Sequence, residues 1–554
     1  MSACIFTSGL SDHFPYCLSI RNDGFKVQNT KHIHINNNSN EALYNFKTDV
    51  ETAILTENII SDPNSDPSHN YKLIENILVT AKHKHLSCKT VKFKKSKHKK
   101  SQWITRGIIK SIKRRDNLYR KFKKTPINST EYDHRKINLR TYNIILKRSI
   151  FIAKKSYYHS LFQKYKSNIK NTWPAILNIL NRNKSKHKLP DQMKINNILT
   201  NDKETIANSF NQYFANIGQN LAANLKETPI NSHMNYMKDR ISTRFSFKPI
   251  NAEIISKLID SIDPKNSLGI DEMSTFLIKL VKSALLIPLT ITINQSLNTG
   301  IFPDRLKIAK IIPLYKKDDQ TKIDNYRPIS LLPAISKIFE RVIYNQLYDY
   351  FTSNNIFYNG QYGFRKNHST ELSALNVVDT IINRMEKGNI PIAVYLDLSK
   401  AFDTLDHQIL LDKLKCYGIK GAALNLCKHY LTNRKQCVEI DHVKSSYINI
   451  ATGVPQGSIL GPLLFIIYIN DLPNASTIFE TIIYADDTTL IANLNDFKHK
   501  CNYNLKNNEI NKELGKISYW LLVNKLSLNI LKSKFMLFYQ PQKRVQIPKI
   551  KESN

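Results

Sequence analysis

The sequence predicts an α+β fold in which an antiparallel sheet carries acidic side chains at one edge. In the run TIIYADDTTLIAN, apolar residues flank Asp486 and Asp487, as in a strand-turn-strand hairpin with both carboxylates at its tip. In IPIAVYLDLSKAFDTLDHQILLDKL, a buried strand over 392–396 ends at Asp397, and a turn and an amphipathic helix follow. Because the strand and the hairpin can pair in one sheet, the three carboxylates are expected to meet.

Two adjacent acids between short strands are more often a solvated turn than a site, so the partner acid decides the interpretation. Carboxylate oxygens suit a hard divalent cation, Mg²⁺ first and Mn²⁺ as an alternative. Asp397, Asp486 and Asp487 together have the ligands for two such ions about 3.5–4 Å apart. One ion would activate an attacking hydroxyl and the other would hold the leaving group.

The chain has 554 residues, 42% of them apolar, which leaves room for several domains with real cores. Its formal net charge of +36 favours a polyanionic partner, nucleic acid first and an anionic membrane surface second. Sixteen lysines or arginines lie between residues 89 and 124, against the single acid Asp116. Binding and chemistry are therefore expected in different parts of the chain.

The segment WITRGIIKSIKRRDNLYRKF predicts a basic amphipathic helix, since its apolar residues keep helical spacing. One interpretation is a solvated helix face. The other is salt-dependent binding to a phosphate backbone, which the overall charge favours. The basic residues on the other faces of this helix are Lys110, Lys113, Arg114, Arg115 and Arg120.

The seven cysteines are odd in number and include no C-x-x-C pair, which argues against a disulfide framework and a zinc ribbon. The N-terminal residues lack the pattern of a signal peptide, and no apolar run approaches the ~20 residues of a membrane span. A soluble, intracellular protein without a membrane partner is expected. The runs KFKKSKHKK and KRR suggest the nucleus as well as the cytoplasm, although such runs also simply bind RNA.

Ordered motifs between residues 306 and 538 resemble the reverse transcriptase of non-LTR, LINE-type retrotransposons of the jockey or chicken-repeat kind. They are LKIAKIIPLYKK, NYRPISLLPAISKIFERVI, QYGFRKNHST, the Asp397 segment, GVPQGSILGPLLF, YADD and WLLVNKLSLNILKSKFMLF. The resemblance implies a right-hand polymerase fold, with the fingers and an N-terminal extension of the reverse transcriptase over 251–390 and an antiparallel palm sheet with helices over 391–540. A group II intron maturase is a lesser alternative.

The same resemblance implies roles for individual residues. Asp397, Asp486 and Asp487 would bind the metal ions, and Lys532 would protonate the departing pyrophosphate. Phe402 would exclude a 2′-hydroxyl, which makes the product DNA. The residues expected to touch template, primer or incoming nucleotide are Lys310, Arg327, Gln361, Phe364, Arg365, Gln456 and Gly457.

The ends of the chain set a limit on the expected activity. The stretch SDHFP resembles the last motif of the endonuclease that these elements carry, so Asp12 and His13 would belong to a remnant over 1–22 that no longer cleaves DNA. A polar and then basic helical linker is expected over 23–250. No thumb follows Phe538, so we expect a polymerase truncated at both ends.

Two functions therefore remain open. The first is an RNA-directed DNA polymerase that uses an RNA template, a DNA primer or target and deoxynucleoside triphosphates. The second is a catalytically impaired remnant of such an element that still binds nucleic acid.

Overall fold

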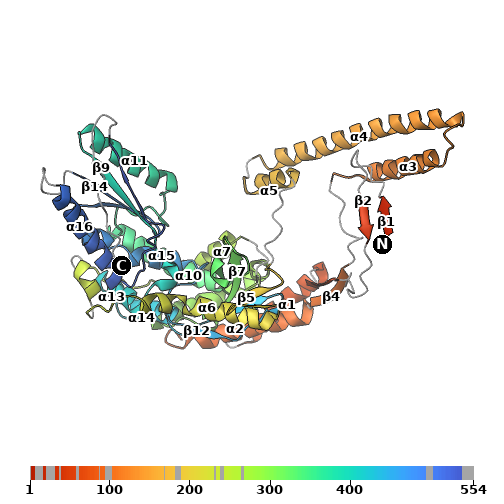
Figure 1. Ribbon diagram of the computed structural model, residues 1–554. Coiled ribbons are helices and arrows are strands. Elements are labelled where there is room, and N and C mark those ends of the chain that lie inside the picture. Colours follow the sequence, from red (N-terminus) through yellow and green to blue (C-terminus); the bar gives the residue numbers. More distant parts are fainter. Residues whose placement is uncertain are drawn as a thin grey trace. The chain divides into compact units, whose positions relative to one another are not determined.

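The computed structural model describes residues 2–5, 16–19, 31–36, 39–57, 62–86, 88–93, 103–166, 169–180, 189–229, 232–237, 242–263, 268–494 and 503–539. The chain divides into two compact units. Unit 1 comprises residues 1–37 and 88–188, and unit 2 comprises residues 38–87 and 189–554. Figure 1 labels many of the elements of both units.

Unit 1 contains two antiparallel strand pairs and a helical hairpin. The strands are β1 (Ser2–Ile5) with β2 (Tyr16–Ser19), and β3 (Lys31–Asn36) with β4 (Cys88–Phe93). The helices are α3 (Arg106–Lys123), α4 (Glu131–Lys164) and α5 (Ile169–Ile179). The Thr105 hydroxyl accepts a hydrogen bond from the Ile108 amide and so caps α3. The predicted basic helix is thus confirmed.

Unit 2 begins with two helices, α1 (Asn40–Thr56) and α2 (Pro67–His85), which pack against α9 (Lys282–Thr299). This finding differs from the polar linker expected over this part of 23–250. Each helix is mostly polar but carries a narrow apolar stripe that packs inward. Its buried residues include Phe46 and Val50 on α1 and Tyr71 and Ile74 on α2. Residues 62–66 form the loop directly before α2, and the Asp66 side chain caps that helix.

Two sheets carry the rest of unit 2. One has the order β13 (Glu480–Tyr484), β14 (Asp487–Asn493), β9 (Pro391–Leu396) and β15 (Lys534–Leu537), and all neighbours are antiparallel. We call it the acidic-edge sheet. The other has the order β11 (Val443–Lys444), β10 (Arg434–Ile440), β7 (Ile308–Tyr315) and β8 (Tyr326–Leu331), with β12 (Ile448–Ile450) also paired to β10. A small hairpin joins β5 (Met193–Ile195) to β6 (Ile198–Thr200).

The remaining helices of unit 2 surround these sheets (Figure 1). Contacts join α11 to three strands of the acidic-edge sheet. The helices are α6 (Lys203–Ala223), α7 (Ala252–Ser261), α8 (Thr275–Leu280), α10 (Ser336–Ser353), α11 (Thr370–Glu386), α12 (Ala401–Thr404), α13 (His407–Cys416), α14 (Ala422–Leu431), α15 (Leu460–Tyr468) and α16 (Tyr503–Val523). The fold is a mixed α/β fold.

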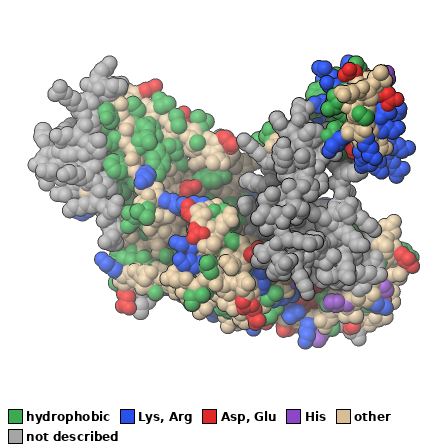
Figure 2. Space-filling model, turned by 45° about the vertical axis from the view of Figure 1, so that its right-hand side comes forward, with side chains coloured by type: hydrophobic (Ala, Val, Ile, Leu, Met, Phe, Trp, Pro, Cys, Tyr) green, Lys and Arg blue, Asp and Glu red, His purple; other side chains and the backbone are tan. Residues whose placement is uncertain are grey.

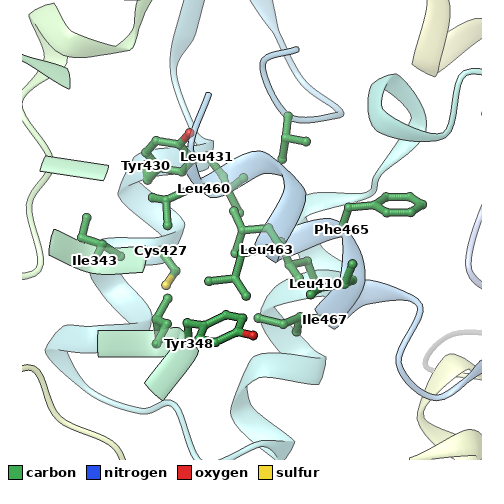
Figure 3. Close-up of a cluster of buried hydrophobic side chains, with 14 of the residues drawn as sticks. Ile343, Tyr348, Leu410, Cys427, Tyr430, Leu431, Leu460, Leu463, Phe465 and Ile467 are labelled. Atoms are coloured by element: carbon green, nitrogen blue, oxygen red, sulfur yellow. The ribbon is translucent and has the colours of Figure 1, made fainter. Parts of the chain in front are cut away.

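The main core lies among α10, α13, α14 and α15 (Figure 3). Tyr348, Leu410, Cys427 and Leu463 point toward one another in this cluster and are all buried. Helix α15 is apolar on all sides and is buried except at Pro462, as expected for a central helix. This core supports the loop before α15, which reaches the candidate site. Within the described residues, the helices are all too short or too polar to cross a bilayer.

Candidate active site

The acidic side chains meet at one edge of the acidic-edge sheet. Strand β9 ends at Leu396, directly before Asp397, and Leu396 pairs with Thr488 of β14. Asp487 opens β14 and pairs with Tyr484 across the hairpin. The antiparallel register therefore brings the end of β9 beside the hairpin tip. The predicted strand, hairpin and pairing are all confirmed.

The hairpin turns within two residues, Ala485 and Asp486. Ala485 has a φ of 58°, a left-handed conformation that costs a residue with a Cβ roughly 1–2 kcal/mol. Gln361 holds this turn, because its Oε1 accepts hydrogen bonds from the amides of Ala485 (3.1 Å) and Gly363 (2.7 Å). A Cβ added to Gly363 would overlap the backbone of Ala485. The acidic tip is thus a strained turn fixed from behind.

A second loop brackets Asp397. Nζ of Lys532 lies 3.0 Å from Oδ2 of Asp397. The amide of Asn529 donates to the Asp397 carbonyl at 2.8 Å, and the Asp397 amide donates to Ser533 Oγ at 3.4 Å. Lys532 is therefore held over the acid by the same turn that fixes the acid's backbone.

A cleft of about 760 Å³ opens at this edge of the sheet. Asp397, Asp486 and Lys532 line one part of it, and residues of α6, β8, α12 and the loop before α15 line the rest. The predicted residues that meet here, besides these three, are Arg327, Phe364, Phe402, Gln456 and Gly457. Sequence motifs more than a hundred residues apart therefore share one cavity.

Basic side chains gather on the cleft wall. Lys316, Arg327, Lys400 and Lys532 all line the cavity. Burial lowers the pKa of Lys316, and the positive charges of Arg327, Lys532 and Lys400 lower it further. Burial also lowers the pKa of Lys400, against the opposing charge of Asp403. Like charges held this close favour a multiply charged anion such as a triphosphate.

The three acids also affect one another. Partial burial raises the pKa of Asp487, and the negative charges of Asp486 and Asp397 raise it further, while Lys532 opposes them. Within the described residues, no three acidic, histidine or cysteine groups lie close enough as they stand to chelate a metal ion. The donor chemistry still fits a divalent cation, because hard carboxylate oxygens with mutual repulsion are its usual ligands.

Aromatic rings form the cleft wall next to the acids. Phe402 lies edge-on to Phe364 with 6.0 Å between ring centroids, and it packs on Phe465 at 4.7 Å. Phe364 is 45% exposed and has a φ of 57°, so it projects from a strained turn into the cavity. Phe402 is braced by the core behind it and presents a fixed ring to a ligand.

The GVPQG loop closes the cleft against β8. The Ser330 amide donates to the Gln456 carbonyl at 2.9 Å. Gly457 has a φ of 121°, and a Cβ there would come within 2.9 Å of the Ser330 carbonyl oxygen. Only glycine allows this close approach of two backbones. The loop therefore holds Gln456 at a defined place in the cleft.

Three of the predicted contact residues, Lys310, Arg365 and Gln361, do not line the cavity. Lys310 lies on β7, is buried, and forms an ion pair with Glu439 of β10 at 3.3 Å. Arg365 donates to the carbonyls of Tyr358 and Gln361, and its guanidinium lies over the Phe357 ring. Both stabilise the walls of the site. Gln361 is likewise buried behind the hairpin.

Three residues that sequence reasoning missed belong to the site. Lys316 and Lys400 line the cleft, and Asp403 bonds to Gln456. A signal was present for two of them, because Lys316 directly follows the apolar run that forms β7 and Lys400 follows Asp397 by three residues. Lys400 adopts a left-handed φ of 51° at the start of α12, which turns it back into the cleft.

The basic helix of unit 1 exposes most of its predicted residues. Figure 2 shows lysine and arginine side chains crowded over the helices of this unit. Lys110, Lys113 and Arg120 are exposed. Arg115 differs, because its side chain is only 11% exposed and pairs with Asp116 at 2.7 Å. The predicted pair Asp12 and His13 lies outside the described residues.

Comparison with known proteins identifies the domain that supplies most of the cleft residues. Residues 315–550 match the family model described as reverse transcriptase (RNA-dependent DNA polymerase). These residues form a reverse transcriptase domain. The Asp397 segment, the hairpin that carries Asp486 and the Lys532 turn all fall within it. The resemblance found in the sequence is confirmed for this part of the chain.

Three of the relatives that match this chain are polymerases of mobile elements in Drosophila melanogaster. The RNA-directed DNA polymerase from mobile element jockey is 33% identical over 264 residues, which cover 46% of this chain and 29% of that protein. The probable RNA-directed DNA polymerase from transposon BS is 34% identical over 257 residues, or 45% and 28%. That of transposon X-element is 32% identical over 223 residues, or 40% and 24%. The chain thus matches less than a third of each relative's length.

Proposed function

We propose that the reverse transcriptase domain catalyses RNA-directed DNA synthesis, in which a primer 3′-hydroxyl attacks an incoming deoxynucleoside triphosphate and pyrophosphate leaves. The observation that carries the proposal is one cleft with carboxylates at its sheet edge and five basic side chains on its wall. The carboxylates are suited to bind the metal ions that activate the primer hydroxyl. The basic residues are suited to bind the triphosphate. In this proposal the acidic-edge sheet is the palm, and the β7–β8 region belongs to the fingers.

Each part of the cleft then has a task. Arg327, Lys316 and Lys400 bind triphosphate oxygens, and Phe402 lies against the sugar, where its ring leaves no room for a 2′-hydroxyl. Lys532 donates a proton to the departing pyrophosphate from its place beside Asp397. Gln456 contacts the nascent base pair from the opposite wall.

Reverse transcriptases generally use divalent metal ions, and Asp397, Asp486 and Asp487 are the residues that would hold them here. Two Mg²⁺ ions would lower the pKa of the primer hydroxyl and offset charge on the phosphates. The protein's own contribution is to hold three mutually repelling carboxylates at one edge. The test is primer extension on an RNA template with deoxynucleotides and Mg²⁺. Ribonucleotide incorporation at an equal rate would contradict the assigned role of Phe402.

A second candidate function is binding of a nucleic-acid backbone by α3, whose exposed cations are its support. Each cation that contacts a phosphate adds about 0.9 to the slope of log affinity against log salt. Replacing Lys110, Lys113 and Arg120 by glutamine should therefore lower that slope by about 3 on duplex DNA. Arg115→Gln is the matched control, because Arg115 is already paired with Asp116. An unchanged slope in the triple variant would remove this function from α3.

A further inference from the structure

The loop that carries Gln456 is tied to α12 by an acid that none of the motif assignments uses. Nε2 of Gln456 donates to both carboxylate oxygens of Asp403, at 2.9 and 2.8 Å. Gln456 lines the main cleft on one side and, with Asp403, a small cavity of about 40 Å³ on the other. The contact therefore joins the cleft wall to the interior behind it.

The position of Asp403 is fixed by close backbone packing. Its amide donates to the Lys400 carbonyl at 2.8 Å, and its carbonyl accepts from Thr452 Oγ1 at 3.2 Å. A Cβ on Gly453 would come within 2.7 Å of that carbonyl oxygen, and a Cβ on Gly218 of α6 would overlap it. Two glycines thus let neighbouring elements close on this one residue, and little freedom is left for its carboxylate.

We propose that Asp403 is a positioning residue that sets the orientation of the Gln456 amide, so that the carbonyl oxygen of Gln456 is the group presented to the nucleotide. An ionised carboxylate only accepts hydrogen bonds, so it selects the NH₂ end of the amide. The Oε1 end is then left to accept from a donor on the incoming nucleotide, a hydroxyl or a base amino group. This inference rests on the proposed polymerase function.

The charge state of Asp403 supplies a signature of this role. Burial raises the pKa of Asp403 to about 6, against the opposing effects of the Gln456 hydrogen bond and the Lys400 charge. Below that pH the protonated acid can donate to Oε1, so the amide loses its single orientation. The other titratable or charged groups around Asp403 and the Gln456 loop are Tyr213 on α6, His407 on α13 and Arg434 on β10.

The experiment compares Asp403→Asn with wild type in KM for deoxynucleotide between pH 5 and 8.5. Asparagine can face the amide either way, so KM should rise about five- to tenfold at pH 8 with little change in kcat. The ratio of variant to wild-type KM should fall toward one below pH 6, where wild type also loses its carboxylate. The control is Asp379→Asn on the exposed face of α11, whose ratio should stay at one throughout.

Two further readouts separate positioning from stability. In a Gln456→Ala background, adding Asp403→Asn should change KM less than twofold, since the group it orients is gone. Asp403→Asn should also raise the unfolding temperature at pH 8. The raised pKa of Asp403 means that its ionisation costs stability as the pH rises through about 6, and the asparagine avoids this cost. The difference in unfolding temperature should vanish toward pH 4. A pH-independent KM ratio or additive effects of the two substitutions would overturn the proposal.

A readout without catalysis distinguishes this inference from the proposed function. In protein labelled with ¹⁵N-glutamine, the side-chain amide signal of Gln456 is identified by its loss in Gln456→Ala. It should shift with a midpoint near pH 6 in wild type and not in Asp403→Asn. If the signal titrates while no nucleotide is incorporated, the polymerase proposal fails and the orienting contact stands. If the signal does not titrate, Asp403 does not set the orientation of the Gln456 amide.

Discussion

Nζ of Lys532 lies 3.0 Å from Oδ2 of Asp397, so a cation of the protein itself already sits against the acid at the end of β9. Lys532 belongs to a turn that begins at Asn529, and the Asn529 amide donates a hydrogen bond to the Asp397 carbonyl. Lysine here balances the charge of the acid and is within reach of a leaving group in the same cleft.

Lys532→Ala should therefore slow nucleotide addition by roughly 100-fold or more, the usual effect of losing a general acid. Affinity for Mg²⁺ should not fall, because the lysine competes with a cation for Asp397. Single-turnover rates at several Mg²⁺ concentrations measure both quantities. Lys387→Ala, on the exposed end of α11, is the control. A normal rate with weakened Mg²⁺ affinity would contradict this role.

Phe402→Ala should relax the choice between deoxyribo- and ribonucleotides. The Phe402 ring is held by Phe465 behind it and faces the cleft, so its loss opens space beside the sugar. The ratio of kcat/KM for dNTP to that for rNTP should fall roughly 10- to 100-fold. Competition assays with both nucleotides measure it, and Phe535→Ala on β15 should leave the ratio unchanged. An unchanged ratio in Phe402→Ala would assign sugar selection to another group.

Gly363→Ala should disturb the acidic hairpin from outside it. The added methyl would overlap the backbone of Ala485, and overpacking of this kind costs about 1–3 kcal/mol. The free energy of unfolding measured with denaturant and the rate of nucleotide addition should both fall. Gly515→Ala in α16 is the matched control, because no atom lies within 4 Å of its Cβ position and alanine favours helix by about 1 kcal/mol. Equal stability and equal rates in Gly363→Ala and Gly515→Ala would show that the close contact between Gly363 and Ala485 does not support the hairpin.

Asp487→Asn should stabilise the protein when no divalent cation is present. The pKa of Asp487 is raised by burial and by its two acidic neighbours, so its ionisation costs stability as pH rises through that pKa. The unfolding temperature of the variant should exceed that of wild type at pH 8 and match it toward pH 4. Added Mg²⁺ should remove the difference at pH 8, since it offsets the repulsion. A variant less stable at pH 8 without metal would show that the three acids do not repel one another.

The sequence was sufficient for the acidic centre. Continuous apolar runs predicted the strand before Asp397 and the two strands that flank Asp486, and the pairing of strand and hairpin is antiparallel. The amphipathic pattern likewise predicted α3. These features depend on local patterns of apolar residues, which the sequence displays directly.

What the sequence hid depends on long-range contacts. Lys310 was expected in the cleft because its motif, like the separate motif of Arg327, resembles the fingers, but its side chain points to β10, where Glu439 neutralises it. Gln361 and Asp403 act on groups 124 and 53 positions away in the chain. Helices α1 and α2 were missed because polar residues dominate their composition while a few apolar ones make the packing.

The most direct test of the central claim is Mg²⁺-dependent incorporation of a single deoxynucleotide on a primed RNA template by wild type, Asp397→Ala, Asp486→Ala and the control Asp379→Ala. The cleft predicts incorporation by wild type and by the control, and a loss of at least about 10³-fold in each of the two cleft variants. Equal incorporation by wild type and Asp486→Ala would contradict the claim that this edge of the sheet is where the reaction takes place.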